Sequence, residues 1–172
     1  MIEVDINKCT GCRMCETACS FYHTGQTNRL LARIKVVNKY ETGIDGPVLC
    51  MQCKERYCMD CPENAISIGD LGQIIISATV CTLCRKCEKS CPVGAIEYFD
   101  DHIYVCDLCG GSPRCVEACT EQALTFVPEK SGVISLSNIK EKAKAMNPGE
   151  KRIFFINRAG VDLRKKWRER NA

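Results

Sequence analysis

The chain has 172 residues, including 16 cysteines, and a formal charge of +3 at pH 7. A chain of this length forms one domain or two small intertwined ones. Its start, Met-Ile-Glu-Val-Asp-Ile, lacks the basic and apolar regions of a secretory signal. No apolar run reaches the length of a membrane span, about 18 residues. We therefore expect a cytoplasmic protein whose thiols stay reduced and bind metal, and not a disulfide-stabilised secreted domain.

The first predicted element is a half-buried strand over residues 2–6, where apolar and acidic residues alternate. A first cysteine group follows with the spacing Cys-x2-Cys-x2-Cys-x3-Cys. The connector over residues 20–49 is predicted to contain a strand near residues 33–40 and a turn over residues 43–47. The first part of the chain is thus predicted as a strand, a ligand loop and a second strand.

Two further cysteine groups are separated by one predicted hairpin. The second group has the spacing Cys-x2-Cys-x4-Cys-x2-Cys-Pro, and a hairpin over residues 65–77 leads into the third. The third group ends in Cys91-Pro92 and has three cysteines spaced by two residues and a fourth after three more. This is the pattern of bacterial ferredoxins, in which three thiolates hold one [4Fe–4S] cluster and the fourth reaches a second. Pro92 lacks an N–H and favours the start of a helical turn.

A second hairpin and a fourth cysteine group complete the cysteine-rich region. The hairpin is predicted over residues 95–105, the fourth group has the spacing Cys-x2-Cys-x5-Cys-x3-Cys, and a strand over residues 123–127 follows. Cys61, Cys91 and Cys119 each begin a Cys-x3-Ala-apolar repeat, and the copies are about 28–30 residues apart. Each copy predicts a ligand, one helical turn and then a strand.

The second and third groups, with one hairpin between them, form a complete two-cluster unit, so the first and fourth groups exchange ligands only with each other. We therefore predict an α+β, ferredoxin-like fold in which one bacterial-type two-cluster module is nested in another. The outer module covers residues 1–49 and 96–128, the inner module residues 50–95, and a C-terminal docking extension residues 129–172. The nesting predicts four metal sites: site 1 with Cys9, Cys12, Cys15 and Cys119; site 2 with Cys106, Cys109, Cys115 and Cys19; site 3 with Cys50, Cys53, Cys58 and Cys91; and site 4 with Cys81, Cys84, Cys87 and Cys61.

Four [4Fe–4S] clusters would change the charge of the assembled protein. Each oxidised cluster with four thiolates carries about −2, so four of them bring the formal charge from +3 to about −5. The slightly basic sequence therefore gives no reason to expect a nucleic-acid partner. The competing class of function is a zinc-bound scaffold or nucleic-acid module, since zinc also binds pairs of Cys-x-x-Cys.

The cysteine-rich region resembles a known class of electron-transfer subunits. Over about residues 2–127 it is similar to the four-cluster, ferredoxin-like subunits of molybdenum and tungsten oxidoreductases. Two stretches most resemble the small subunits of tungsten-containing aldehyde oxidoreductases: Cys-Thr-Gly-Cys-Arg-Met-Cys-Glu-Thr-Ala-Cys-Ser-Phe-Tyr-His, which ends at His23, and Cys-Asp-Leu-Cys-Gly-Gly-Ser-Pro-Arg-Cys, which ends at Cys115. The resemblance implies a large catalytic subunit that carries a tungstopterin or molybdopterin, and a ferredoxin or another redox partner.

The sequence departs from that family at two places. Cys58 and Cys61 are separated by two residues where related subunits have three, which rotates one ligand by about a third of a helical turn. Ser20 and Thr120 replace the proline after the fourth cysteine of the outer groups. We expect the shorter spacing to affect site 3 most, and the missing prolines to cost local rigidity without affecting ligation.

Charged residues stand within the ligand loops, and two histidines stand outside the cysteine pattern. The basic residues are Arg13, Lys54, Arg85 and Lys86. We expect these to be solvated loop charges, with an effect on cluster potentials as the alternative. His23 and His102 are expected to be polar loop residues, and a hydrogen bond from His23 near a cluster is the alternative.

The region after about Glu129 has no cysteine. Asn138 with Glu141 predicts a capping box for a helix through residue 146, which Asn147-Pro148-Gly149 is expected to end. Residues 152–157 are predicted as a buried strand or docking segment. The basic end around Trp167 is predicted to form an interface, with a solvated tail as the alternative.

A cluster with four protein thiolates has no open coordination position, so the chain is predicted to exchange single electrons and not to be catalytic alone. The predicted function is a relay through four clusters between a partner catalytic subunit, of the tungsten aldehyde oxidoreductase type, and an acceptor. The alternatives are a subunit of a complex of the formate dehydrogenase or hydrogenase type, and a free polyferredoxin. No direct membrane span is expected.

Overall fold

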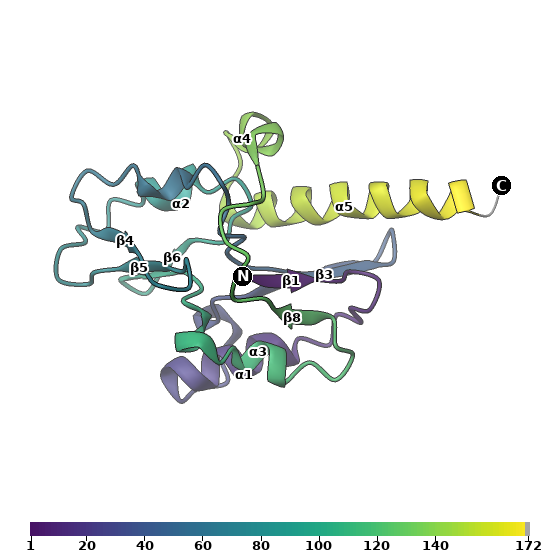
Figure 1. Cartoon of the computed structure of the whole chain (residues 1–172), viewed down its shortest axis with the longest axis horizontal. Coiled ribbons are helices and arrows are strands. Elements are labelled where there is room, and N and C mark those ends of the chain that lie inside the picture. Colours follow the sequence, from purple (N-terminus) through teal and green to yellow (C-terminus); the bar gives the residue numbers. More distant parts are fainter. Residues whose placement is uncertain (171–172) are drawn as a thin grey trace.

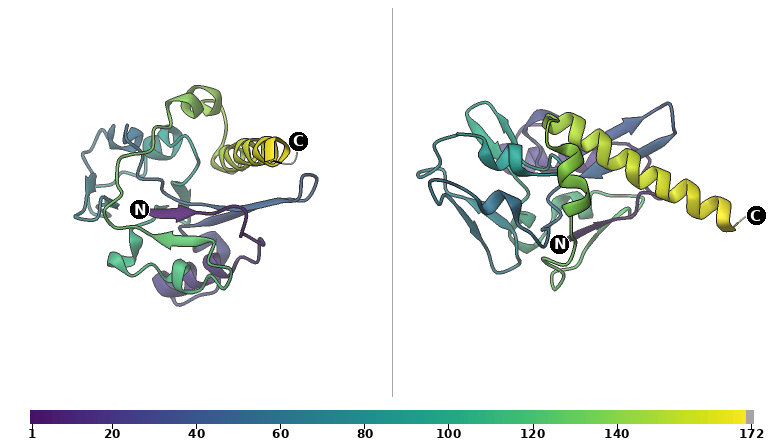
Figure 2. Two further views of the ribbon diagram at one scale, coloured as in Figure 1. Left: turned by 45° about the vertical axis from the view of Figure 1, so that its right-hand side comes forward. Right: turned by 90° about the horizontal axis from the view of Figure 1, so that it is seen from above.

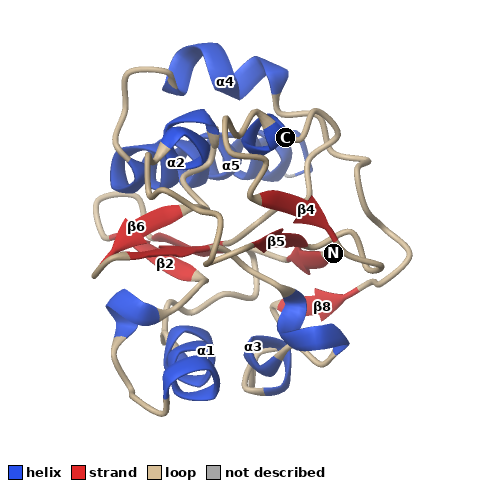
Figure 3. Ribbon diagram, turned by 90° about the vertical axis from the view of Figure 1, so that its left-hand side faces the viewer, coloured by secondary structure: helices blue, strands red, loops and turns tan. Residues whose placement is uncertain are grey.

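The structure, a computed structural model, describes residues 1–170. Within these residues, eight short strands form four antiparallel pairs. The strands lie in a middle layer, with helices α2, α4 and α5 on one side and α1 and α3 on the other (Figure 3). The α+β class expected from the sequence is confirmed. The helices are α1 Met14–Thr24, α2 Lys86–Ser90, α3 Arg114–Glu117, α4 Ser137–Ala143 and α5 Pro148–Arg170, with 3-10 turns at Arg29–Leu31, Tyr57–Met59 and Leu108–Gly111.

The first and last strands of the cysteine-rich region pair with each other. Strand β1, Ile2–Val4, runs antiparallel to β8, Leu124–Phe126. Both strands were predicted, but their pairing was not, and Figure 1 shows the two ends of the region side by side above α1 and α3. Ile2 is fully buried in this pair, which closes the outer part of the molecule around everything between.

Two hairpins occupy the other end of the molecule, as predicted. Strands β4, Ile66–Ile68, and β5, Ile74–Ile76, form the first, and β6, Glu97–Phe99, and β7, His102–Tyr104, form the second. In the second hairpin, Asp100 and Asp101 both have positive φ angles, 47° and 55°. This is the backbone of a two-residue type I′ turn, which acidic and asparagine residues tolerate.

The connector differs from the prediction. Strand β2, Lys35–Lys39, was expected, but the predicted turn over residues 43–47 is wrong, because Ile44–Val48 forms strand β3 and pairs with β2. The turn lies earlier and is held by Gly43 with φ 61°. In the sequence, Pro47 is typical of a turn. A proline is tolerated in this strand because each strand of a two-stranded ribbon has a free edge.

The C-terminal region differs more. Helix α4 has Leu136 before its first residue and no side-chain cap, so the predicted capping box of Asn138 and Glu141 is wrong. Asn147 instead caps α5: its Oδ1 accepts a hydrogen bond from Glu150 N at 3.0 Å, and Glu150 Oε2 accepts one from Asn147 N at 2.8 Å. Asn147-Pro148-Gly149 therefore begins a helix where the sequence predicted an end, since proline suits a first helical turn as well as a stop.

Helix α5 runs through the segment that was predicted as a strand, residues 152–157, and that prediction is wrong. The helix crosses the β2–β3 ribbon (Figure 2). Two glycines permit this approach. A Cβ at Gly46 would lie 2.6 Å from Ile156 Cδ1, and a Cβ at Gly160 would lie 2.0 Å from Ile44 Cδ1. Beyond Gly160 the helix extends away from the rest of the molecule, as Figure 1 shows.

Buried side chains form two hydrophobic clusters. One contains Ile2, Ile34 and Leu49 with cysteines of the first and fourth groups. The other contains Val48, Ile96 and Ile156 with cysteines of the second and third groups, and so draws on α5 as well. Cys50 is packed against both clusters, which makes its loop the junction between the two halves of the fold.

Candidate metal centres

All sixteen cysteines are free thiols, carried on loops that lead into or out of short helices. The first and third groups have the same local backbone. Gly11 and Arg13 have φ angles of 68° and 64°, and Leu83 and Arg85 have φ angles of 57° and 61°. A left-handed residue after the second ligand turns the chain sharply, so that successive thiols face one centre. A non-glycine residue held in this region costs of order 1 kcal/mol or more, as is common at functional sites.

Two partly enclosed cavities are each lined by four cysteines. Cys50, Cys53, Cys58 and Cys91 line one, and Cys61, Cys81, Cys84 and Cys87 line the other. In both, three cysteines come from one sequence group and the fourth from the group on the other side of the β4–β5 hairpin. These are the residues grouped by sequence as sites 3 and 4.

The shorter Cys58–Cys61 spacing is accommodated by a 3-10 turn. Tyr57–Met59 forms this turn after Arg56, whose φ angle is 48°. A tight turn places Cys58 toward one cavity and Cys61 toward the other. The spacing therefore does not remove a cysteine from either cavity.

The outer cysteines are brought together in the same manner. The charges of Cys12 and Cys119 act on Cys9, where burial is the first cause that raises the thiol pKa. Burial likewise raises the pKa of Cys115, and the charges of Cys19 and Cys109 raise it further. The structure thus gathers cysteines of the first and fourth groups, although about 90 to 110 positions separate them in sequence.

The burial of these thiols limits which metal groups they can bind. Burial, followed by the charges of neighbouring cysteines, raises the pKa of Cys58 to about 12, and burial raises that of Cys50 to about 12 as well. Four thiolates around one dry cavity repel one another and lack solvation, so they require a multiply charged cation between them. Metal binding deprotonates such thiols and supplies folding free energy. The donor set and the cavities fit iron–sulfur clusters.

Backbone N–H groups donate to the cysteine sulfurs. Ala95 N lies 3.3 Å from Cys91 Sγ, and Ala123 N lies 3.3 Å from Cys119 Sγ. This gives a physical reason for the Cys-x3-Ala repeat, because one helical turn returns the backbone to the sulfur and both alanines are buried. Hydrogen bonds of this kind stabilise negative charge on the sulfur and help to set a cluster's potential.

A buried glutamate, paired with a partly exposed arginine, stands behind each of two ligand loops and was missed from sequence. Glu16 and Glu88 are 2% and 3% exposed, and each pairs with the arginine three residues earlier. Glu16 Oε1 accepts a hydrogen bond from Val36 N at 2.7 Å, and Glu88 Oε1 accepts one from Tyr98 N at 2.8 Å. Arg13 and Arg85 are therefore partners of carboxylates and not free loop charges. The signal was present in the sequence: Cys-Thr-x-Cys-Arg-x-Cys-Glu occurs in both groups.

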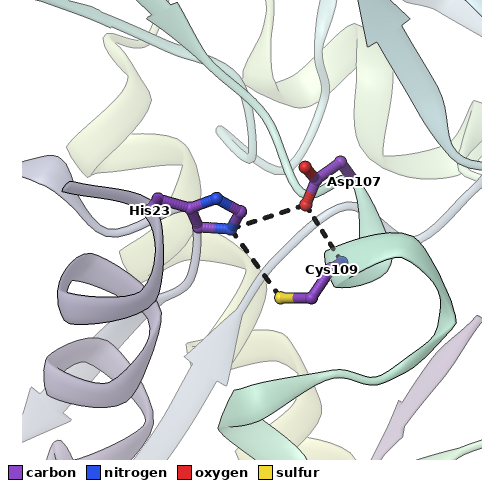
Figure 4. Close-up of side chains that lie close together, drawn as sticks. All are labelled: His23, Asp107 and Cys109. Carbon is purple, nitrogen blue, oxygen red and sulfur yellow. Dashed lines mark hydrogen bonds and ion pairs between the residues drawn. The ribbon is translucent and has the colours of Figure 1, made fainter. Parts of the chain in front are cut away.

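His23 lies beside a cysteine, which corrects its expected place in a loop. It stands in the last turn of α1, with Nε2 at 3.7 Å from Cys109 Sγ and 3.5 Å from Asp107 Oδ1 (Figure 4). Asp107 also pairs with Arg33 at 2.5 Å. Burial and then Arg33 lower the pKa of His23, while Asp107 raises it, so the ring is neutral at pH 7. When the neutral ring carries its proton on Nε2, that proton faces two acceptors, the Asp107 carboxylate and the Cys109 sulfur.

The cysteine sets lie in a row. Burial is the main cause that raises the pKa of Cys115 of site 2, and the charge of Cys15 of site 1 adds to it. Sites 1 and 2 therefore lie side by side. Burial raises the pKa of Cys106, and Cys50 is the first cysteine whose charge adds to this, so sites 2 and 3 are also adjacent. Sites 3 and 4 share the two cysteine groups that flank the β4–β5 hairpin. Cys12 and Cys84, at the two ends of the row, are exposed, and no other cysteine is.

Comparisons with known proteins agree with this chemistry. Two family profiles, each described as a 4Fe-4S binding domain, match residues 1–24 and 74–97. The chain is 39% identical over 124 residues to the polyferredoxin-like subunit of the aliphatic sulfonate oxidoreductase of Pyrococcus furiosus, covering 70% of this chain and 71% of the relative. It is 31% identical over 146 residues to a subunit of the anaerobic dimethyl sulfoxide reductase of Escherichia coli, covering 73% and 71%.

Among solved structures, a subunit of the BamBC active-site complex of benzoyl coenzyme A reductase, as isolated, is 28% identical, with a TM-score of 0.44 and coverage of 73% and 74%. From residue 1 to residue 170, no helix is both long and apolar enough to cross a bilayer.

The spacing of the cysteines and the 4Fe-4S domain matches show a ferredoxin-like fold with bacterial-type modules and a C-terminal helix, and sixteen cysteines fit four [4Fe–4S] clusters. The chain belongs to the family of ferredoxin-like, [4Fe–4S] electron-transfer subunits of oxidoreductase complexes.

Proposed function

We propose that this chain relays single electrons along four [4Fe–4S] clusters, between the pterin cofactor of a catalytic subunit and a second redox protein. The observation that carries this is the row of cysteine sets with one exposed cysteine at each end, Cys12 and Cys84. Electron transfer needs contact with a partner at two places and shielding between them. The two middle sites have buried or half-buried cysteines only.

In this proposal all sixteen cysteines are ligands, in the four sets given above. When bound, the clusters supply one-electron exchange without an open coordination position. The chain's own residues shield the middle sites, donate N–H groups to sulfur and fix the loops through Arg–Glu pairs. The outer module of residues 1–49 and 96–128, the inner module of residues 50–95 and the docking extension of residues 129–172 are part of the same proposal.

The catalytic partner is proposed to carry a tungstopterin, as in aldehyde oxidoreductases of the tungsten type. The resemblance of the loops that end at His23 and Cys115 supports the tungsten type, and the 39% identity to the sulfonate oxidoreductase subunit supports a role beside a catalytic subunit of an oxidoreductase. The match to a subunit of a dimethyl sulfoxide reductase favours a molybdopterin partner as the second candidate. A cytoplasmic location and a soluble ferredoxin as the other partner complete the proposal.

Two measurements test the proposal. The chain prepared without oxygen should contain about sixteen irons and a matching amount of acid-labile sulfide, and zinc in place of iron would refute it. Tagged chain recovered from its native host should then bring down a large subunit that contains tungsten. Molybdenum in its place identifies the second candidate, and a chain that is recovered alone with full iron would be a free polyferredoxin.

A further inference from the structure

Helix α5 places a buried lysine between the two inner sites. Lys151, in the first turn of α5, is 2% exposed and is the largest of the fully buried side chains. Its Nζ donates to the backbone carbonyl of Lys89 at 2.7 Å and lies 3.4 Å from that of Glu88. These carbonyls belong to the last turn of α2, between Cys87 of site 4 and Cys91 of site 3.

No carboxylate within residues 1–170 forms an ion pair with this ammonium group. Among the ion pairs of the described residues, none includes Lys151. The nearest acidic side chain along α2, Glu88, is already engaged by Arg85 and by Tyr98 N. A buried cation is costly unless a negative charge compensates it. The charge of Cys91 is the first that favours the protonated form of Lys151, ahead of Glu88, although burial as the main effect lowers its pKa.

We infer that Lys151 is a positioning residue that raises the reduction potential of the inner clusters, chiefly that of site 3, through its buried positive charge. The inference rests on the proposed ligand sets. A cluster with four thiolates becomes more negative on reduction, so a fixed cation nearby favours the reduced state. The low dielectric around a buried group strengthens this interaction relative to that of a surface charge. Sites 3 and 4 would therefore hold the electrons in preference to sites 1 and 2. Because Lys151 lies on α5, the reduction potentials of sites 3 and 4 would depend on how the C-terminal region packs.

The ordinary alternative is that Lys151 only satisfies the end of α2, because lysine side chains bond the last carbonyls of helices. Two substitutions separate the roles. Lys151→Gln keeps a hydrogen-bond donor near the carbonyls and removes the charge, while Lys151→Arg keeps the charge. Lys165→Gln is the matched control, since Lys165 lies on the same helix and its side chain is 76% exposed.

The experiment is a redox titration of the anaerobic full-length chain, followed by electron paramagnetic resonance, after iron and sulfide have been measured in each protein. We expect Lys151→Gln to lower the midpoint of one cluster signal by about 59 mV, which corresponds to a tenfold change in the ratio of reduced to oxidised cluster for a one-electron couple. Lys151→Arg and Lys165→Gln should keep the wild-type midpoints.

Unchanged midpoints in Lys151→Gln with full iron would overturn the inference and leave the proposed function standing. Loss of a cluster from Lys151→Gln but not from Lys151→Arg would show a role in holding the fold alone, and would also overturn it. Absence of iron and sulfide from the wild-type chain would refute the proposed function itself, and this inference with it.

Discussion

At the scale of single residues, the buried glutamates explain how a short loop keeps its shape around a metal site. Glu16 holds the first ligand loop against strand β2, and Glu88 holds the third against β6. Each carboxylate accepts hydrogen bonds from an arginine of its own loop and from a backbone N–H of a neighbouring strand. The loop and the strand are thereby fixed to each other before any contact with metal is considered.

Replacing Glu16 by leucine tests this arrangement. The change leaves Val36 N without an acceptor and Arg13 without its carboxylate partner, so we expect a loss of about 2 kcal/mol, within the range for a buried unsatisfied group. For a chain of this size that lowers the unfolding midpoint by roughly 4–8 °C. Glu16→Gln keeps an acceptor and should lose less. Equal midpoints for the leucine and glutamine variants, measured by circular dichroism without oxygen, would contradict the role of the hydrogen bond.

His23 provides a second test at this scale. Its Nε2–H lies against Cys109 Sγ, and hydrogen bonds to a ligand sulfur raise a cluster's potential. His23→Phe removes the donor and should lower the midpoint of one signal, that of site 2. His102→Phe is the matched control, since His102 bonds only to the Asp100 carbonyl in the second hairpin. A shift of the same size in both variants would count against the specific contact.

The grouping of the cysteines around shared cavities could be predicted from sequence, because their spacing alone gives the pattern. The burial of Lys151 could not be predicted, because nothing in the sequence near position 151 indicates that this side chain points into the core and not into solvent. Glu16 and Glu88 stand between these cases. Their repeated place after a cysteine was visible, but the strand N–H that each one accepts from comes from a residue 20 or 10 positions away.

At the scale of elements, the start of α5 depends on one glycine. Gly94 has φ 67°, and a Cβ there would lie 2.2 Å from the Pro148 carbonyl oxygen. Arg152 also donates to the Gly94 carbonyl at 2.9 Å, so the loop after Cys91 and the first turn of α5 are held in direct contact. The sequence pattern did not show this helix start, because Asn-Pro-Gly occurs at helix ends as well.

Gly94→Ala should therefore displace the start of α5. We expect a loss larger than the about 1 kcal/mol that a left-handed alanine costs on its own. Gly25→Ala is the control, since Gly25 has φ 69° and no atom within 4 Å of its Cβ position. Faster hydrogen exchange of α5 amides should appear in Gly94→Ala and not in Gly25→Ala. Similar unfolding free energies for the two variants would refute the contact.

Glu97 joins three elements and makes their contact sensitive to acid. Its carboxylate on β6 pairs with Arg152 of α5 at 3.0 Å and with Lys35 of β2 at 3.2 Å. Burial raises the pKa of Glu97, but Arg152 and Lys35 outweigh this, and the pKa stays below its usual value. A lowered folded-state pKa means that the stabilisation is complete above the unfolded value, about 4.3, and is lost as the pH falls through the folded value.

Glu97→Gln should consequently destabilise the seating of α5 at neutral pH by about 2 kcal/mol, as for hydrogen bonds to charged groups. The difference from wild type should close in acid, where the wild-type carboxyl is protonated. Hydrogen exchange of α5 amides in both proteins, compared at about pH 7 and in acid well below the reference value of about 4.3, measures this. A difference that is the same at both pH values would contradict the ion-pair origin.

At the scale of the whole molecule, the C-terminal helix has two parts with different roles. Up to Gly160 it is built into the core through Lys151 and Ile156, so removal of residues 150–172 would disturb the inner half of the molecule. Beyond that point it extends from the body, and residues 161–172 contain five basic and two acidic side chains. A chain end of this kind, with Trp167 61% exposed, suits contact with an acidic partner surface.

Truncation after Gly160 separates the two roles. The shortened chain should keep its iron content and its unfolding midpoint, because the removed part leaves the described core intact. It should recover less of the pterin-containing subunit from the native host, measured as tungsten or molybdenum per iron. Truncation after Gly149 is the contrasting variant and should lose inner clusters. Full recovery of the partner by the chain ending at Gly160 would show that the extended part of α5 is not the docking surface.

The pairing of β1 with β8 has a consequence for how the protein is made. The ribosome releases Ile2 long before it has added Leu124, so the outer half waits for a strand more than a hundred residues downstream. The inner half also depends on late residues, because Leu136 lines the site 3 cavity and Ile156 of α5 packs in the same hydrophobic cluster. Domains generally fold as units during synthesis. Stable cluster insertion should therefore follow synthesis of nearly the whole chain, and a chain interrupted at about residue 110 should retain little iron.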